Sequence, residues 1–429
     1  MDARELVDYS KSLDCIHCGL CLRTCPTYRL TGVESSSPRG RIYMMRAVAE
    51  EQLDIRDADF REEMDFCLVC RHCESVCPAG VRFGEMMETT RASVESTTKR
   101  PLHERFARWL GFRVVLPSRA WLKLSMSALR FAQVTGLLRL VAPLGGERGK
   151  SLLAFPRVPP ASERRALAST TAAQGEKRGA VALLEGCVMR ELYGRVNRAT
   201  ADVLAANGFE SKVASDHVCC GALHAHNGDL QGARDLATKT IERFDALDSS
   251  LPIIVNSAGC GAHMKEYGRL LSDDPAWSAR AKHFSARVKD FTEFVAAQAS
   301  AAWKPALDAR SSPGAIAYDD PCHLCHGQQI RSQPRALLDR VAGLQRVELP
   351  ESEACCGSAG IYSVLRPRDS RAVFAGKLKA LEECGARVLV TANPGCHLQW
   401  ESGLARANSG VRVMHIAEVL ALAHGERTA

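Results

Sequence analysis

The sequence predicts a multidomain protein of mixed α+β and α/β class, with a small α-helical domain, a basic helical connector and a duplicated α/β domain containing parallel sheets. Three observations lead to this prediction. Two cysteine runs of identical spacing begin the chain, a basic stretch with helical periodicity follows, and the rest of the chain repeats one cysteine pattern twice. We therefore expect four units, at residues 1–95, 96–178, 179–300 and 301–429.

Both cysteine runs read C-x2-C-x2-C-x3-C-P, the spacing with which bacterial ferredoxins hold 4Fe-4S clusters. In two-cluster ferredoxins the fourth cysteine of each run binds the cluster of the other run. The sequence therefore predicts a two-cluster ferredoxin-like domain that holds two 4Fe-4S clusters. We assign the first cluster to Cys15, Cys18, Cys21 and Cys77, and the second to Cys67, Cys70, Cys73 and Cys25.

The segment between the two runs predicts a helix that starts close to the first cysteines. Serines at 35–37 followed by Pro38 favour a helix N-terminus, so we expect a helix over about 39–51. Its arginines either lie near the thiolates and offset their charge or form a solvated face, and the sequence leaves both interpretations open. These residues are Arg39, Arg41 and Arg46. A second helix over about 84–96 would close the domain.

Cysteine usage points away from a disulfide scaffold. The chain has 18 cysteines in 429 residues, and all but Cys325 and Cys384 fall into repeated patterns. The N-terminus lacks the apolar segment of a secretory signal, and no run of 18 apolar residues predicts a membrane span. We therefore expect a cytoplasmic protein in a reducing compartment, where clustered cysteines indicate metal or redox chemistry.

The connector carries more than the whole net charge of +7, and its apolar residues follow helical spacing. We expect amphipathic helices over about 101–144 and a flexible linker over 156–178. The interpretation that we favour is that these helices pack their apolar faces on the neighbouring domain, as most such stripes do. Docking on a partner subunit and peripheral association with an anionic membrane surface are the alternatives. Nucleic-acid binding is not expected, because no recognition motif accompanies the charge.

The C-terminal part contains the same cysteine pattern twice: a single cysteine, a Cys-Cys-Gly motif and another single cysteine, with offsets of 135, 136 and 136 residues between the copies. Each single cysteine follows a strand-like run, and helical patterns lie between, which predicts a parallel sheet in each copy. Because the carboxyl ends of parallel strands meet at one edge, we expect four thiols to converge in each copy. They are Cys187, Cys219, Cys220 and Cys260 in the first and Cys322, Cys355, Cys356 and Cys396 in the second.

Four converging thiols indicate a metal centre or a redox dithiol site. We favour a further Fe–S centre in each copy, because adjacent cysteines suit a single tetrahedral zinc ion poorly and the first domain already carries Fe–S ligands. Zinc and metal-free thiols remain the alternatives. Histidines flank these sites and could support the metal, relay protons or simply be polar loop residues; they are His224, His263, His323, His326 and His397.

These patterns together resemble a known family. Residues 18–32 read CGLCLRTCPTYRLTG and residues 34–46 read ESSSPRGRIYMMR. With the two cysteine runs and the two Cys-Cys-Gly units, they resemble the iron-sulfur subunits of flavin-dependent 2-hydroxy-acid dehydrogenases, and those of glycolate oxidase in particular. The resemblance implies an electron-transfer subunit that works beside a flavin-binding dehydrogenase subunit and passes electrons to a quinone or another acceptor as glycolate becomes glyoxylate.

Two related functions are kept as alternatives. An iron-sulfur subunit of a lactate or glycerol-3-phosphate dehydrogenase would show the same motifs. The Cys-Cys-Gly units are also similar to those of heterodisulfide reductases, which implies a thiol/disulfide redox enzyme with a non-cubane cluster. There the last motif is C-x-x-C, whereas here its second cysteine is replaced by His263 and Gln399, so a full non-cubane cluster is not expected. No G-x-G-x-x-G follows a strand, so we expect substrate oxidation to occur in the partner.

Overall fold

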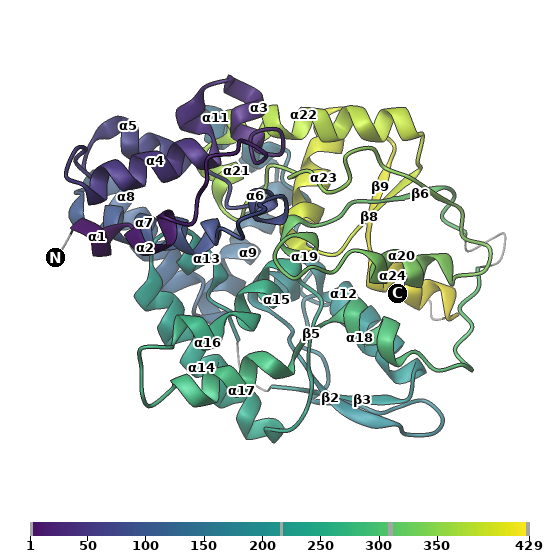
Figure 1. Cartoon of the computed structure of the whole chain (residues 1–429). Helices are drawn as coiled ribbons and strands as arrows, with labels where there is room; N and C mark the ends of the chain where they lie inside the picture. The colour runs from purple at the N-terminus through teal and green to yellow at the C-terminus, as the bar shows by residue number, and fades with distance from the viewer. Residues whose placement is uncertain (1–2, 215–217, 308–311, 426–429) are drawn as a thin grey trace.

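The computed structural model of the chain describes residues 3–214, 218–307 and 312–425 (Figure 1). It is a helix-rich structure with two parallel sheets, which confirms the predicted fold class. The N-terminal helices lie together at one end of the molecule (Figure 1).

The cysteine-rich N-terminal region is built from short helices around a methionine-rich core. Ser37 caps α4 by accepting a hydrogen bond from the backbone N–H of Gly40, as the serine run predicts. The core side chains Met45, Phe60 and Met86 are fully buried between α4, α5 and α7. The elements are α1 (Ala3–Leu6), α2 (Tyr9–Ser12), α3 (Pro26–Thr31), η1 (Glu34–Ser36), α4 (Pro38–Ala49), α5 (Ala58–Phe66), α6 (His72–Ser75) and α7 (Phe83–Thr97).

The connector is helical, but the expectation that it packs its apolar faces on the neighbouring domain is wrong for most of its large side chains. Phe112, Leu122 and Leu138 are buried, whereas most of the other large apolar residues face solvent. Within the described residues no helix is long and apolar enough to cross a membrane. The elements are α8 (Leu102–Trp109), the π-helix η2 (Leu110–Val115), α9 (Arg119–Val134), α10 (Leu137–Val141), η3 (Ala142–Gly145) and α11 (Gly146–Leu153).

Residues 156–178, expected as a flexible linker, are instead partly tied to the first repeat. Val158 is fully buried, and Arg164 forms a buried ion pair with Glu191 at 3.0 Å. The strand β1 (Thr170–Thr171) adds to the sheet in antiparallel orientation. The serine, proline and glycine content of this segment therefore marks a surface crossing rather than a free tether.

The first Cys-Cys-Gly repeat is a parallel sheet in the order β3-β2-β4-β5, with β1 at its edge. Its strands are β2 (Gly179–Leu183), β3 (Phe209–Val213), β4 (Ile253–Val255) and β5 (Val288–Asp290). Its helices are α12 (Cys187–Ala206), α13 (Ala222–His226), α14 (Leu230–Asp248), α15 (Ala258–Lys265), α16 (Tyr267–Leu270), α17 (Ser278–Arg287) and α18 (Phe291–Gln298).

The second repeat has the same topology, in the order β7-β6-β8-β9, so the internal duplication is visible in the fold. Its strands are β6 (Ile316–Tyr318), β7 (Arg346–Val347), β8 (Val388–Thr391) and β9 (Arg412–His415). Its helices are α19 (Cys322–Cys325), α20 (Ser332–Asp339), α21 (Tyr362–Leu365), α22 (Pro367–Cys384), α23 (Pro394–Arg406) and α24 (Ile416–Ala423).

The two repeats face each other through the carboxyl ends of their strands. The backbone N–H of Ala258 donates to the carbonyl of Ala392 at 3.2 Å, and both residues follow the central strand of their own sheet. The N-terminal domain contacts both repeats: Arg71 pairs with Glu266 of the first at 2.5 Å, and the hydroxyl of Tyr362 in the second donates to the carbonyl of Phe66. This arrangement brings the second cysteine run of the N-terminal domain against the Cys-Cys-Gly loop of the second repeat.

Candidate metal centres

Each cysteine run folds as a tight loop that requires left-handed backbone conformations. His17 and Gly19 have positive φ in the first run, at 55° and 83°, and Val69 and Arg71 occupy the matching positions of the second, at 51° and 62°. This conformation costs a non-glycine residue about 1–2 kcal/mol. The same strain at the same positions of two loops indicates that thiol placement, rather than local stability, sets their geometry.

The first predicted thiol set lies at the molecular surface. Its four cysteines line a single cavity together with Cys73; they are Cys15, Cys18, Cys21 and Cys77. The thiol-bearing residue Cys18 is exposed, and the cavity rim carries the exposed apolar side chains Ile16 and Leu20. A group held here would therefore be accessible to a partner protein.

The second predicted thiol set is buried. Its members are Cys67, Cys70, Cys73 and Cys25. Burial raises the pKa of the Cys73 thiol, and it also raises the pKa of Cys25, although the nearby guanidinium of Arg41 opposes this. Such thiols stay protonated unless a cation stabilises the thiolate form, and metal binding supplies that cation. The chemistry of this site therefore fits a metal cluster better than free thiols.

The arginines of α4 lie at the cysteine loops, as the first of the two interpretations from sequence proposes. Arg39 donates a hydrogen bond to the carbonyl of His17 at 3.1 Å. Arg46 donates to the carbonyl of Cys15 at 3.3 Å. Arg41 is fully buried and donates to the carbonyl of Ser36 at 2.8 Å, close to Cys25. These side chains hold the loop backbone and supply positive charge beside sulfur.

The first repeat brings its four predicted cysteines together. The thiols of Cys187 and Cys219 are within hydrogen-bonding reach of each other, as are those of Cys220 and Cys260. The Cys-Cys-Gly loop thus joins the single cysteines that follow β2 and β4, as expected from sequence. Leu122 of the connector helix α9 packs in the same apolar cluster as Cys187 and Cys219 and covers this side of the set.

The second repeat also gathers its four cysteines, but with a different neighbour. The thiol of Cys355 is within hydrogen-bonding reach of those of Cys322 and Cys356, and Cys356 reaches Cys396. Cys355 also reaches Cys70 of the N-terminal domain. The second repeat set and the second ferredoxin-type set are therefore in direct contact.

The residues that replace the last cysteine of a C-x-x-C motif do not join the thiols. His263 is buried and faces Glu88 and His226, and its burial lowers its pKa to about 4. Gln399 donates to the hydroxyl of Ser370 at 3.1 Å. The extra cysteine of the second repeat, Cys325, is fully buried beside Cys322. Neither replacement offers a fifth ligand at these thiol sets.

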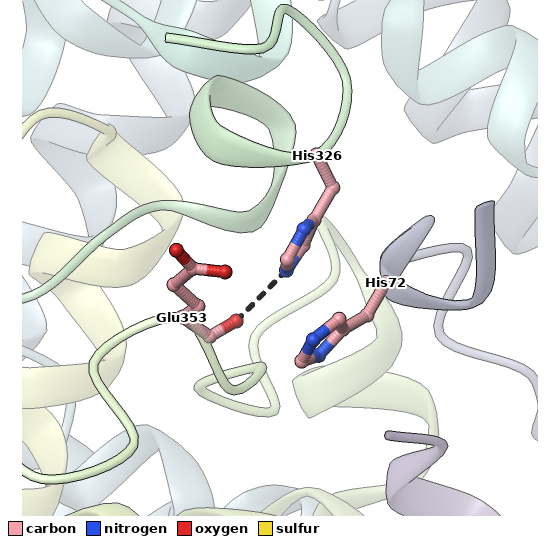
Figure 2. Close-up of side chains that lie close together, drawn as sticks. All are labelled: His72, His326 and Glu353. Carbon is pink, nitrogen blue, oxygen red and sulfur yellow. Dashed lines mark hydrogen bonds between the residues drawn. The ribbon is translucent and has the colours of Figure 1, made fainter. Parts of the chain in front are cut away.

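A group of side chains that includes His326, one of the flanking histidines, bridges the N-terminal domain and the second repeat outside the thiol sets (Figure 2). The rings of His72 and His326 stack with centroids 4.0 Å apart. His326 Nε2 donates to the backbone carbonyl of Glu353 at 3.0 Å, and its Nδ1 lies 2.8 Å from the hydroxyl of Ser75. Ligand atoms of His72, His326 and Glu353 lie close enough for one ion, but both ring nitrogens of His326 are engaged and Arg331 pairs with the Glu353 carboxylate. We interpret the group as a clamp between the two units.

One feature beside the second repeat set was not found from sequence. Asp319, at the end of β6, forms a buried ion pair with Lys377 of α22 at 2.6 Å, next to Cys356. In the first repeat, the residues at the matching positions are Leu184 and Thr240. The strand register aligns Asp319 with Leu184. The packing of α14 on Gly221 and of α22 on Gly357 aligns Lys377 with Thr240. The only sign of this ion pair in the sequence was Lys377 itself, a lysine on the otherwise buried face of the predicted helix.

The sulfur-only donor sets fit iron–sulfur chemistry. The structure brings together the cysteines of each predicted set, and the contact between Cys70 and Cys355 could not be read from spacing. The ligand assignment within each set, and the choice of iron or zinc in the repeats, stay predictions.

Comparison with known families finds two kinds of domain in the chain. The 4Fe-4S dicluster domain family matches residues 11–81. The cysteine-rich domain family matches residues 181–265 and again residues 316–401, one match in each repeat.

Curated relatives match over most of their length. The chain is 35% identical to the probable glycolate oxidase iron-sulfur subunit of Bacillus subtilis (strain 168), over 99% of this chain and 97% of the relative. It is 33% identical to the glycolate oxidase iron-sulfur subunit of Escherichia coli (strain K12), over 92% of this chain and 91% of that protein. Lactate utilization protein A of Bacillus subtilis is 31% identical, over 56% of this chain and 98% of the relative.

Among solved structures, a hypothetical protein from Helicobacter pylori is similar in fold. Its crystal structure superposes with a TM-score of 0.56 and 9% sequence identity, and the match covers 98% of this chain and 75% of that one. At this identity the similarity concerns the fold alone.

Proposed function

The chain belongs to the family of glycolate oxidase iron-sulfur subunits, and from this premise we propose that it is the electron-transfer subunit of a flavin-dependent glycolate dehydrogenase complex. Oxidation of glycolate to glyoxylate releases two electrons and two protons, and reduction of a quinone to a quinol takes up both. When bound, iron–sulfur clusters accept and release single electrons. In this proposal a flavoprotein subunit oxidises glycolate, and a quinone or another acceptor takes the electrons at a membrane surface.

The observation that carries the proposal is the placement of the thiol sets relative to the surface and to one another. The first set opens to solvent at Cys18, while the second set is buried and touches the second repeat through Cys70 and Cys355. Clusters that only stabilised the fold would not require contact between two thiol sets. The placement of these thiol sets thus supports an inward path for electrons, from the exposed first set to the buried second set and the second repeat.

The exposed end of this path has the character of a protein-docking site. The side chains of Ile16 and Leu20 are exposed on the first cysteine loop, next to the backbone held by Arg39 and Arg46. Apolar side chains that surround a redox centre and carry a basic rim suit the approach of a complementary protein surface. We assign this site to the flavoprotein subunit.

Glycolate is favoured over lactate by the extent of the similarity. Both glycolate oxidase relatives align over more than nine-tenths of this chain, whereas the lactate utilization relative aligns over 56% of it. A thiol/disulfide enzyme is disfavoured because His263 and Gln399 stand at the positions of the missing cysteines. Lactate and glycerol-3-phosphate remain the substrates to compare in the assay.

The test is to purify the native complex anaerobically and measure oxidation of glycolate, lactate and glycerol-3-phosphate with a dye and with a quinone. We expect glycolate to be the preferred substrate and Ile16→Glu to reduce co-purification with the flavoprotein subunit. Iron and zinc analysis of the same sample distinguishes Fe–S from zinc in the repeats. Absence of glycolate oxidation, with activity on lactate or glycerol-3-phosphate, would refute the glycolate assignment.

A further inference from the structure

The connector presents an apolar surface that nothing else in the described part of the chain covers. The helix α8 buries no residue at all. Leu102, Phe106 and Trp109 are spaced by four and three residues, so they share one face of α8, and each is more than half exposed. A free helix of this composition would normally bury that face against a core.

The next helix, α9, has two apolar stripes with different surroundings. Its inner stripe contains Leu122, which is buried on the thiol-bearing residues Cys187 and Cys219. Its outer stripe contains Trp121, Leu124 and Phe131, which are 51%, 56% and 64% exposed. The helix is therefore not simply a lid on the first repeat, because a lid needs only the inner stripe.

The same exposure continues through α10 and η3. Leu140 is 75% exposed and Leu144 is 87% exposed. We call the exposed apolar side chains of α8, α9, α10 and η3, together with Arg105, Lys123 and Arg139, the outer connector face. Isolated exposed apolar residues are ordinary, but an array that extends over successive helices marks an interaction surface.

The charges on this segment define the kind of partner. Every exposed charged residue between residues 102 and 153 is basic. The two acidic residues there are partly covered and already paired, Glu104 with Arg100 and Glu147 with Arg371. The side chains of Arg105, Lys123 and Arg139 form no ion pair with any residue that the structure describes. The surface is thus apolar, rich in tryptophan and purely cationic.

We propose that the outer connector face docks on an anionic lipid surface. Tryptophan, phenylalanine and leucine on short helices insert at the interface of a bilayer, and exposed arginine and lysine bind anionic headgroups. This proposal rests on the proposed function. It adds the part of the chain through which the complex would bind a membrane. Because the inner stripe of α9 covers Cys187 and Cys219, docking places the first repeat thiols about one helix diameter, roughly 10 Å, from the lipid.

The direct test is flotation of the purified full-length holoprotein with phosphatidylcholine vesicles, with and without phosphatidylglycerol. We expect binding to the anionic vesicles, weak binding to phosphatidylcholine alone, and loss of binding at high salt. Vesicles that contain brominated lipids should quench Trp109 and Trp121, whereas Trp303 and Trp400 are buried and should not respond. Equal binding to both vesicle types, or none to either, would overturn the proposal.

Substitutions locate the binding surface. We expect Phe106→Glu with Trp109→Glu to abolish flotation without loss of the fold, because α8 buries no residue. Reversing the charge at Lys123 or Arg139 changes the local charge by two units and should weaken binding about 30-fold for each position. The matched control reverses two exposed lysines of the repeats, Lys239 and Lys304, and should leave binding unchanged.

Failure of this proposal is distinguishable from failure of the proposed function. The Phe106→Glu, Trp109→Glu variant should still oxidise glycolate with a water-soluble dye in the complex, whereas Ile16→Glu should impair the complex and leave vesicle flotation intact. If the former variant floats normally with anionic vesicles, the lipid assignment is wrong. If it instead loses the flavoprotein subunit, the face is a protein interface and the lipid assignment is equally wrong.

Discussion

The two Cys-Cys-Gly repeats share a topology and a cysteine pattern, yet their thiols meet different neighbours. The set of the first repeat lies under helix α9 of the connector, through Leu122. The set of the second repeat touches the N-terminal domain, through Cys70 and Cys355. A duplicated scaffold can therefore hold similar sites while the segments packed against it decide with which part of the molecule each site communicates.

The surroundings inside the sheets differ as well. The second repeat contains the buried pair Asp319 and Lys377 beside its thiols, where the first repeat has Leu184 and Thr240 at the matching positions. Hydrogen bonds with the thiols of Cys355 and Cys396, with a smaller contribution from the nearby Lys377 cation, lower the pKa of Cys356, and burial of the carboxylate raises the pKa of Asp319. The second site thus has a buried ion pair beside its thiols, whereas the matching positions of the first repeat are uncharged.

The largest difference between the repeats should appear when one cysteine of each is replaced. We expect Cys355→Ser to reduce electron transfer through the complex by about 10- to 100-fold and to change the electron paramagnetic resonance signal of the second ferredoxin-type set, because Cys355 touches Cys70. Cys219→Ser should leave that signal unchanged. The control is Cys384→Ser, outside both patterns. Identical spectra for Cys355→Ser and Cys219→Ser would remove the proposed distinction.

The buried ion pair gives the next largest effect, on stability. Lys377→Met should destabilise the protein by about 3–5 kcal/mol, because it leaves the buried carboxylate of Asp319 without a partner. The double variant Asp319→Leu, Lys377→Thr copies the first repeat and should be close to neutral. Urea unfolding of both variants measures this. A double variant as unstable as the single one would show that the matched positions are not equivalent.

The glycines of the two Cys-Cys-Gly motifs should respond unequally to alanine. Both have a φ of +83°, but a Cβ atom at Gly357 would lie 2.6 Å from the carbonyl oxygen of Ser370, and one at Gly221 would lie 3.1 Å from that of Ala233. We expect Gly221→Ala to cost about 1–2 kcal/mol for the left-handed conformation, and Gly357→Ala to cost more. Unfolding midpoints should show this order, and the reverse order would contradict the packing described.

The smallest effect concerns pH. Asp290 and His415 cap α18 and α24 at corresponding positions, and burial raises the pKa of Asp290 to about 6 and lowers the pKa of His415 to about 3. The Asp290 contribution to stability is therefore lost as pH rises through 6. His415 acts in the opposite direction. As pH falls below about 6.5, its imidazole becomes protonated in the unfolded chain but not in the folded protein, so stability falls.

Replacement of either cap isolates its part of the pH dependence. Between pH 6.5 and 5.5 we expect His415→Asn to remove about 1 kcal/mol of the acid-induced loss of stability, measured as the change in the unfolding free energy. Asp290→Asn should remove the opposing slope between about pH 4 and 6. An unchanged pH profile in both variants would mean that the two caps are not buried in solution as they are in the structure.

Local sequence signals predicted much of the fold because they act locally. Ser37 before Pro38 fixes the start of α4, and each strand before a cysteine is a short apolar run. The predicted duplication appears as two sheets of the same strand order. The apolar periodicity of the connector also predicted helices correctly, but it indicates only that a face is apolar. It cannot tell whether that face is covered, which is why the expected packing of Trp121 and Phe131 is wrong.

The sequence by itself determined the four cysteine sets, the helical connector and the repeat, because cysteine spacing and hydrophobic period are properties of short segments. Only the tertiary structure decided that Cys70 meets Cys355, that Asp319 pairs with Lys377 and that the outer stripe of α9 stays open. These contacts join residues far apart in the chain, and they follow from how the sheets and helices pack. No local pattern in the sequence carries that information.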